Sequence, residues 1–286
     1  GLTNSRLLIY LYFFNRRLIK SSIWSVWGGD VYFYNYANTC LRNKFIEYLS
    51  RRVIPKIPVI TSLVKGDYDI VKEVYGTEAK YVYSYYPVPI DSILLKRISN
   101  DNKESNNTIL VGNSGAPSNN HIEVLQHLIQ LKEYNISIVC PLSYGDKIYI
   151  EKVISYGKEV FGNKFIPLTD FIPPIDYSRI LMKVNIAIMN HNRQQGLGSI
   201  INLLLLKKKV YIRSDTTSFV FFRDNGVKIF DAIDFDKLSL QELFYMDDNT
   251  AKHNQQRIAD IFSNEEAVKG WNNVFLECKK YSRGCK

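Results

Sequence analysis

Short strand-like runs alternate with helical patterns along almost all of the 286 residues of the chain. Such alternation is typical of βαβ units, in which helices cover the faces of a parallel sheet. We therefore predict an α/β fold with strands at Ile23–Trp27, Pro58–Ser62, Lys80–Ser84, Thr108–Gly112, Ser137–Cys140, Lys164–Leu168, Asn185–Met189 and Lys209–Ile212. Helices are expected between them, most clearly at Asn38–Arg52, Asn119–Lys132, Lys147–Phe161 and Ser199–Leu206.

One stretch, Tyr86–Asn107, breaks this alternation. It carries a "PVP" kink, little periodicity and the polar run "SNDNKESNN", which together are typical of a linker. The strand that follows opens a fresh α/β series. We predict two Rossmann-like domains, residues 1–96 and residues 97–286, with helices from Asn249 to the end of the second domain.

The charge and the cysteines narrow the classes of function. A formal charge of +9 suits nucleic acid, an anionic membrane surface or phosphorylated small molecules. No compact basic stripe interleaved with aromatic residues occurs, so a nucleic-acid partner is the least favoured of these. Cys40, Cys140, Cys278 and Cys285 lack CxxC spacing, which disfavours a zinc site or a disulfide framework. The apolar runs Leu7–Phe14 and Leu203–Leu206 are too short to span a bilayer.

The first candidate site is a glycine turn between a strand and a helix. Gly112, Asn113, Ser114 and Gly115 follow the strand Thr108–Gly112, at the edge of an open sheet where ligands bind. The next helix there offers unpaired N–H groups and a partial positive charge to an anion. The alternative is a tight turn in which Asn or Ser caps the helix. This segment by itself favours neither interpretation.

A second glycine turn shifts the balance towards a nucleotide diphosphate. After the strand Asn185–Met189 comes the run Arg193-Gln194-Gln195-Gly196-Leu197-Gly198, and then a helix. The two glycines again place bare backbone at a helix N-terminus, and an arginine can pair with a diphosphate through two N–H groups. The alternative for Arg193 is a loop arginine in solvent. Two such turns in one domain favour nucleotide-diphosphate binding.

A third candidate lies in the first domain. The strand Ile23–Trp27 ends in Gly28-Gly29-Asp30, so a carboxylate stands at the carboxyl end of a strand. Asp30 is a candidate general base, or a group that orients a hydroxyl. From its position alone, Asp30 is equally well explained as a helix N-cap.

Other polar patterns are weaker candidates. Asp67-Tyr68-Asp69 and Asp234-Phe235-Asp236 fit the D-x-D pattern of metal-dependent sugar transferases, but each precedes a helical run in which Asp is an ordinary cap. His121 and His127 point to different faces of a helix and predict no metal cluster. Lys207–Lys209 is best explained as the end of a helix, where basic residues favour the dipole.

Four motifs together resemble one family, the TDP-N-acetylfucosamine:lipid II N-acetylfucosaminyltransferases of glycosyltransferase family 56. "WSVWGGDVY" resembles the family's W-x-x-W-G-x-D-x-Y segment, and "ILVGNSGAPSNNH" its I-L-V-G-N-S-G stretch followed by S-N-x-H. "VCPLSYG", which contains Tyr144, resembles its V-x-P-x-x-Y strand end, and "RQQGLG" its R-Q-Q-G-I-G turn. Their order and spacing agree, and the likeness extends to "GW" at Gly270-Trp271.

The resemblance implies a GT-B fold, with two Rossmann-like domains facing across a cleft and the donor in the C-terminal one. It implies transfer of an acetamido-deoxyhexose from a TDP-sugar to a polyprenyl-diphosphate-linked saccharide. In enterobacteria this step belongs to the assembly of enterobacterial common antigen. The expected location is peripheral, on the cytoplasmic face of the inner membrane, where a basic protein suits an anionic surface. The expected donor-binding residues are Gly112, Asn113, Ser114, Gly115, Tyr144, Arg193, Gln194, Gln195, Gly196 and Gly198. No metal or other cofactor is expected, because Arg193 and backbone amides can offset the charge of the leaving diphosphate.

The chain also departs from the expected pattern. It begins at Gly1, in what reads as the middle of a helix, so the N-terminal domain is expected to be truncated. Asn202 stands where many retaining GT-B enzymes have a glutamate, and Lys207–Lys209 replaces an expected small residue, Gly and Pro. The rival hypothesis is therefore a truncated or inactive homologue that binds a nucleotide sugar without turnover.

Overall fold

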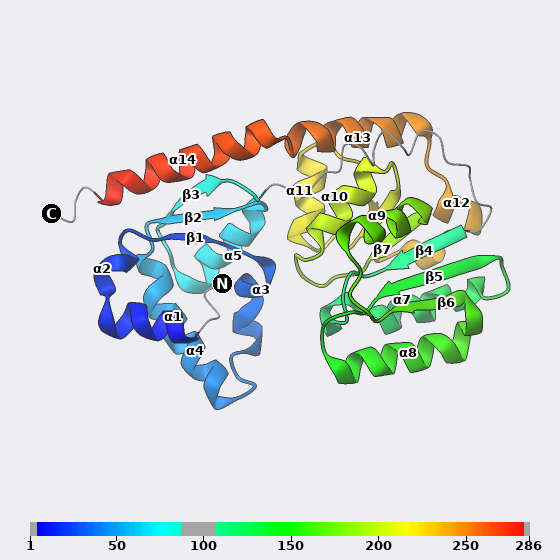
Figure 1. Cartoon of the computed structure of the whole chain (residues 1–286), viewed down its shortest axis with the longest axis horizontal. Helices are drawn as coiled ribbons and strands as arrows, with labels where there is room; N and C mark the ends of the chain where they lie inside the picture. Colours follow the sequence, from blue (N-terminus) through cyan, green and yellow to red (C-terminus); the bar gives the residue numbers. More distant parts are fainter. Residues whose placement is uncertain (1–4, 87–106, 283–286) are drawn as a thin grey trace. The chain divides into compact units, whose positions relative to one another are not determined.

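The chain forms two compact α/β units (Figure 1). The computed structural model describes residues 5–86 and 107–282. Unit 1 comprises Gly1–Pro87 and Phe262–Lys286, and unit 2 comprises Val88–Ile261. The predicted boundary between residues 96 and 97 lies outside the described residues, as does nearly all of the predicted linker Tyr86–Asn107.

Unit 1 is built on a three-stranded parallel sheet in the order β1-β2-β3. Its strands are β1 (Ile23–Ser25), β2 (Val59–Ser62) and β3 (Lys80–Tyr83). Its helices are α1 (Ser5–Ile9), α2 (Arg16–Ile19), α3 (Gly28–Val31), α4 (Leu41–Val53), α5 (Lys65–Tyr75) and the C-terminal α14 (Asn264–Ser282), and a π-helical turn, Tyr10–Phe14, joins α1 to α2. Each of the three strands was predicted, with ends that differ by one or two residues.

Successive residues of β2 point to opposite faces of this sheet, as strand geometry requires. Ile60 packs with α4 and α5 in the main core of the unit. Val59 packs instead with Val274 and Cys278 of α14, which lies along β2 and β3 (Figure 1). The sequence-based division placed this helix in the second domain. The apolar face of α14 packs instead against the second face of the unit 1 sheet, and the helix covers this face.

Unit 2 is a doubly wound parallel sheet in the order β6-β5-β4-β7-β8-β9. Its strands are β4 (Asn107–Val111), β5 (Ile136–Pro141), β6 (Phe165–Leu168), β7 (Ile186–Met189), β8 (Lys209–Ile212) and β9 (Phe230–Asp231). Its helices are α7 (His121–His127), α8 (Lys147–Phe161), α9 (Pro174–Lys183), α10 (Leu197–Leu205), α11 (Thr217–Asp224), α12 (Leu240–Phe244) and α13 (Asp248–Ile261). The chain runs outward from β4 to β6 and then returns to β7, beside β4, so the strand order reverses between β4 and β7.

The core of unit 2 explains why the sequence pattern was readable. The central strands are almost completely buried, as parallel strands covered on both faces must be. One face of the sheet packs against α7 and α8 through Val124, Leu125 and Val153. The predicted strands of this half are confirmed, whereas β9 was not predicted because two residues carry no periodicity.

Candidate functional site

Two glycine turns meet at the point in unit 2 where the strand order reverses. In a doubly wound sheet this is the place where ligands bind, beyond the carboxyl ends of the strands. Gly112 follows β4, and its N–H donates to the Ile188 carbonyl of β7 (3.1 Å). Gly112 has a φ of +68°, and a Cβ at this position would lie 2.6 Å from Nε2 of His121. Glycine is therefore required here by both the backbone conformation and the space beneath it.

The side chain of Gln195 joins the two turns. Its Nε2 donates to Oδ1 of Asn113 (3.0 Å), and its Oε1 accepts from the hydroxyl of Ser118 (2.5 Å). Asn119 completes the arrangement, because its Oδ1 accepts the Asn113 N–H (2.9 Å) and its Nδ2 donates to the hydroxyl of Ser114 (3.3 Å). Asn113, Ser114 and Gln195, three of the residues expected to bind the donor, thus lie close together. Their side chains hold the turns in place through contacts within the protein.

A third loop, after β5, reaches the first turn by direct contact between backbones. The Gly115 N–H donates to the Tyr144 carbonyl (2.7 Å), and the Asp146 N–H donates to the Gly115 carbonyl (3.1 Å). A Cβ on Gly145 would lie 2.3 Å from the carbonyl carbon of Gly115. The Tyr144 ring is 62% exposed, and its hydroxyl is 3.5 Å from Nδ2 of Asn113. Tyr144 therefore stands at the open side of the turn.

The N-terminus of α10 is the strongest feature for an anion at this edge. Gly196, with a φ of +68°, precedes the helix and supplies no side-chain cap. The first N–H groups of a helix without a cap are free to bind an anion, and the helix dipole favours negative charge there. The Arg193 guanidinium donates to the Gln194 carbonyl (3.4 Å), and within the described part of the chain it forms no ion pair with a carboxylate. In the chain, Gln194 lies between Arg193 and Gly196, and Gly198 is in the first turn of α10.

Two buried histidines underlie the turns. The His121 ring sits beneath Gly112, and Cε1 of His191 would lie 2.9 Å from a Cβ on Gly196. Burial lowers the pKa of His121 to about 4. Burial is the main cause that lowers the pKa of His191 to about 3, and the positive charge of Arg193 adds to it, as would that of His121 if it were protonated. Both rings are therefore neutral at physiological pH and add no charge of their own to the anion site.

Asp30 lies in unit 1, at the carboxyl end of β1. It is the third residue of α3, its N–H donates to the Trp27 carbonyl (2.8 Å), and Trp27 occupies the N-cap position. The alternative interpretation of Asp30 as an N-cap is therefore wrong. Its side chain is buried, with 8% exposed. Asp67 occupies the same place in α5, after β2, and is buried as well.

The remaining aspartates of the D-x-D patterns are engaged elsewhere. Asp69 pairs with Lys65 (3.0 Å) and Asp234 with Lys237 (2.6 Å). Asp236 lies 2.8 Å from Nδ1 of His127, across the surface of unit 2. No group of three potential metal-ligating side chains occurs in residues 5–86 or 107–282.

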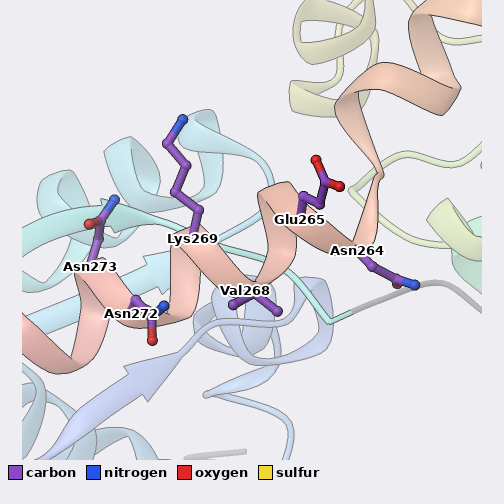
Figure 2. A pocket seen from close by; sticks show the side chains of 6 residues that line it. All are labelled: Asn264, Glu265, Val268, Lys269, Asn272 and Asn273. Carbon is purple, nitrogen blue, oxygen red and sulfur yellow. The ribbon is translucent and has the colours of Figure 1, made fainter.

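A hollow on the surface of α14 was not predicted from the sequence. It is lined by side chains of that helix alone, among them the amides of Asn264, Asn272 and Asn273 (Figure 2). Glu265 and Lys269 project from the same helix (Figure 2). The lining also includes Val268 and the acidic Glu265 in the first turn of α14, and it contains no glycine turn, so the hollow differs from the anion site in unit 2.

Comparison with known families decides the kinship of the chain. A family model described as "4-alpha-L-fucosyltransferase glycosyl transferase group 56" matches residues 4–280. The chain belongs to glycosyl transferase group 56. The family suspected from the four motifs is thus confirmed.

Solved structures show the fold of this group 56 chain. It aligns with the N-terminal domain of trehalose-6-phosphate phosphatase from Candida albicans at a TM-score of 0.61 and 9% identity, over 87% of this chain and 62% of that one. Its alignment with the UDP-forming trehalose-phosphate synthase of Burkholderia xenovorans has a TM-score of 0.63 and 9% identity, and covers 83% of this chain and 64% of that one. Its alignment with WaaG, a glycosyltransferase involved in lipopolysaccharide biosynthesis, has a TM-score of 0.55 and 10% identity, and covers 84% of this chain and 68% of that one. The predicted GT-B type α/β fold is confirmed. The chain spans less than two thirds of the length of the first two of these structures.

Some residues of the site escaped sequence reasoning. Ser118, Asn119 and Gly145 were quoted within motifs, but their hydrogen bonds and close contacts depend on how three loops meet. His191 gave no signal in the sequence, because its position beneath Gly196 depends on how the loop after β7 folds. The readable signal was the glycine at the end of "VCPLSYG", because a glycine after a strand end often marks a close backbone approach.

Proposed function

We propose that the chain is a glycosyltransferase that moves a sugar from a TDP-sugar donor to a polyprenyl-diphosphate-linked saccharide acceptor. The sugar is an acetamido-deoxyhexose of the 4-acetamido-4,6-dideoxygalactose type, and the pathway is cell-surface polysaccharide assembly. The observation that carries the proposal is the pair of glycine turns after β4 and β7, joined by Gln195 beside the uncapped N-terminus of α10. Kinship with group 56 supports the sugar chemistry.

In this proposal the diphosphate of the donor lies against the N-terminus of α10. Backbone N–H groups and the Arg193 guanidinium offset the negative charge that grows on the leaving diphosphate, which is the role that a metal ion has in other transferases. The neutral rings of His121 and His191 support the turns from beneath. Tyr144 borders the same turn from its open side, and Asp30 of unit 1 is the proposed base for the acceptor hydroxyl.

Replacing Arg193 by Ala tests the donor site. Loss of charge-assisted hydrogen bonds, each of about 1.5–3 kcal/mol, is expected to weaken TDP binding by roughly tenfold or more. The melting temperature should hardly change, because the side-chain hydrogen bond of Arg193 goes to the carbonyl of the adjacent Gln194 and joins no distant element. Isothermal titration calorimetry with TDP measures the effect. Arg223→Ala is the matched control, since the Arg223 guanidinium is paired with its neighbour Asp224 at the surface of unit 2. Unchanged TDP affinity in Arg193→Ala would refute the assignment.

We further propose that the protein attaches peripherally to the anionic cytoplasmic face of a bacterial inner membrane. Among the described residues no helix has the length and apolar character needed to cross a bilayer. The surface of unit 1 from α1 to α2 exposes Tyr10, Phe13 and Phe14 and carries Arg16 and Arg17. The first acidic residue of the chain is Asp30, so positive charge at this surface is not offset along the sequence. Basic and aromatic side chains together suit an interface with anionic lipid.

The expected result is binding to vesicles that contain anionic phospholipid, with release at high salt because salt screens surface charge. Sedimentation with vesicles measures it, and vesicles of phosphatidylcholine alone are the control for charge. Arg16→Glu combined with Arg17→Glu should weaken the binding. Retention at molar salt, with release only by detergent, would show that the attachment is hydrophobic and not electrostatic.

A further inference from the structure

Four aromatic side chains form a continuous row on unit 1. The Trp27 ring stacks on that of Tyr86, with centroids 5.6 Å apart and planes 18° apart. The Tyr86 ring is 5.2 Å from that of Trp271, which is 5.8 Å from that of Phe275. The row therefore joins residues that follow β1 and β3 to residues on α14. We call these four side chains the aromatic platform.

The aromatic platform is exposed to solvent although it is apolar. Trp27 is 58% exposed, Tyr86 51% and Phe275 52%. Single exposed apolar residues are common on protein surfaces, but contiguous apolar patches mark binding sites. Four rings in mutual contact make such a patch. Trp271 also packs against the small core of Val59, Val274 and Cys278, whereas Trp27, Tyr86 and Phe275 belong to neither core cluster of unit 1.

One ring of the platform, that of Trp271, is anchored by a hydrogen bond to the segment after β3. The indole N–H of Trp271 donates to the Tyr85 carbonyl (3.0 Å), and the Tyr85 hydroxyl donates to the Ser263 carbonyl (2.8 Å). The Tyr85 ring also packs edge-on against Phe262, at 5.2 Å between centroids. The strand end and the start of α14 are thereby fixed to each other. Preorganisation of this kind lowers the entropy cost of binding.

Amide side chains as well as the apolar Val268 lie on α14 beside the platform, and the amides favour a sugar over a hydrocarbon as the ligand. Trp271 and Phe275 lie on α14 among the residues whose amide side chains border the surface hollow, such as Asn272 (Figure 2). At the other end of the row, Asp30 lies in the same helical turn as Trp27. Amides and carboxylates bind the hydroxyl groups of a sugar, whereas a polyprenyl chain offers them no partner. A pyranose ring meets both needs, because it has hydroxyl groups at its rim and C–H groups on its faces that suit the negative face of an aromatic ring.

We propose that the aromatic platform binds pyranose rings of the saccharide acceptor, by stacking on their apolar faces. The proposal rests on the glycosyltransferase function proposed above and adds where unit 1 holds its substrate. The platform begins at Trp27, three residues before Asp30, so an acceptor on it lies next to the proposed base. Trp27, Tyr86, Trp271 and Phe275 are then binding residues that determine specificity for a saccharide.

Intrinsic fluorescence provides a direct test, because two of the three tryptophans of the chain belong to the platform and the third, Trp24, is buried. The probe is N,N′-diacetylchitobiose, a neutral disaccharide with acetamido groups. A saturable change of tryptophan fluorescence is expected. Replacing Tyr86 or Phe275 by Leu keeps an apolar side chain but removes the flat face, and should weaken the binding by about tenfold. Both side chains are about half exposed, so these variants are expected to fold.

Tyr245→Leu is the matched control, since Tyr245 is 65% exposed in unit 2 and lies outside the platform. Disaccharide affinity should be unchanged in this variant. TDP affinity, measured by calorimetry in all three variants, should equal that of the unaltered chain. Equal disaccharide affinity in all variants, or no binding by the unaltered chain, would overturn the platform. So would a loss of binding to vesicles that contain anionic phospholipid in the Tyr86 and Phe275 variants with no change for the disaccharide. Failure of the glycosyltransferase proposal is distinguishable, because it would appear as absence of TDP binding or of sugar transfer, neither of which the disaccharide measurement requires.

Discussion

Replacing Asp30 by Asn is expected to lower the rate of sugar transfer by roughly 10²–10⁴, because an amide has the shape of the carboxylate but cannot accept the proton of the acceptor hydroxyl. The affinity for TDP should be unchanged, since the proposed donor site lies in unit 2. Turnover is measured with a radiolabelled or chromatographically resolved sugar, and donor binding by calorimetry. The pairing of a large loss in turnover with an unaltered donor affinity is the expected signature of a base on the acceptor side.

Two other aspartates serve as comparisons. Asp69 is paired with Lys65 at the surface, and Asp69→Asn should leave turnover unchanged. Asp67 is the informative one, because it occupies the same position in α5 as Asp30 does in α3, and the two helices are in contact. Normal turnover in Asp30→Asn, together with a loss in Asp67→Asn, would remove Asp30 from the catalytic role and transfer it to Asp67.

The strands could be predicted from the sequence because a strand that is buried on both faces of a sheet is apolar along its whole length. Residues such as Ile109, Leu110 and Ile188 are completely buried, so their segments read as apolar runs between polar turns. The turns of the site could also be predicted, since Gly112 and Gly196 have a positive φ, which few other residues adopt. The parts that follow from a local rule were therefore accessible.

The place of α14 was not accessible from the sequence. Its apolar positions, including Val274 and Cys278, show that the helix has a buried face but do not identify the sheet that covers it. The chain order suggested unit 2, which immediately precedes the helix. The decisive contact, between Val274 and Val59, joins residues that are far apart in the chain. The aromatic platform was hidden for the same reason, because Trp27, Tyr86 and Trp271 come together only after α14 has returned to unit 1.

Replacing Gly145 by Ala is expected to destabilise unit 2 and to weaken donor binding together. Gly145 has a φ of +137°, and an added Cβ would lie 2.3 Å from the carbonyl carbon of Gly115 and 2.5 Å from its oxygen. Both neighbours are backbone atoms, so no side chain can rotate away. A residue forced into such a backbone conformation costs about 1–3 kcal/mol, and the clash adds to this cost. Thermal unfolding and TDP calorimetry measure the two effects.

The coupling of these effects follows from the way the loops are joined. The loop after β5 holds the first glycine turn through the Gly115 N–H and carbonyl, and Asn113 of that turn holds the second through Gln195. If the Gly145 side of this contact moves away, the turn that borders α10 loses its support, and the anion site loses its shape. Gly198→Ala is the control for stability, because a Cβ there meets no atom within 4 Å. A stable Gly145→Ala variant with full TDP affinity would show that the three loops do not act as one unit.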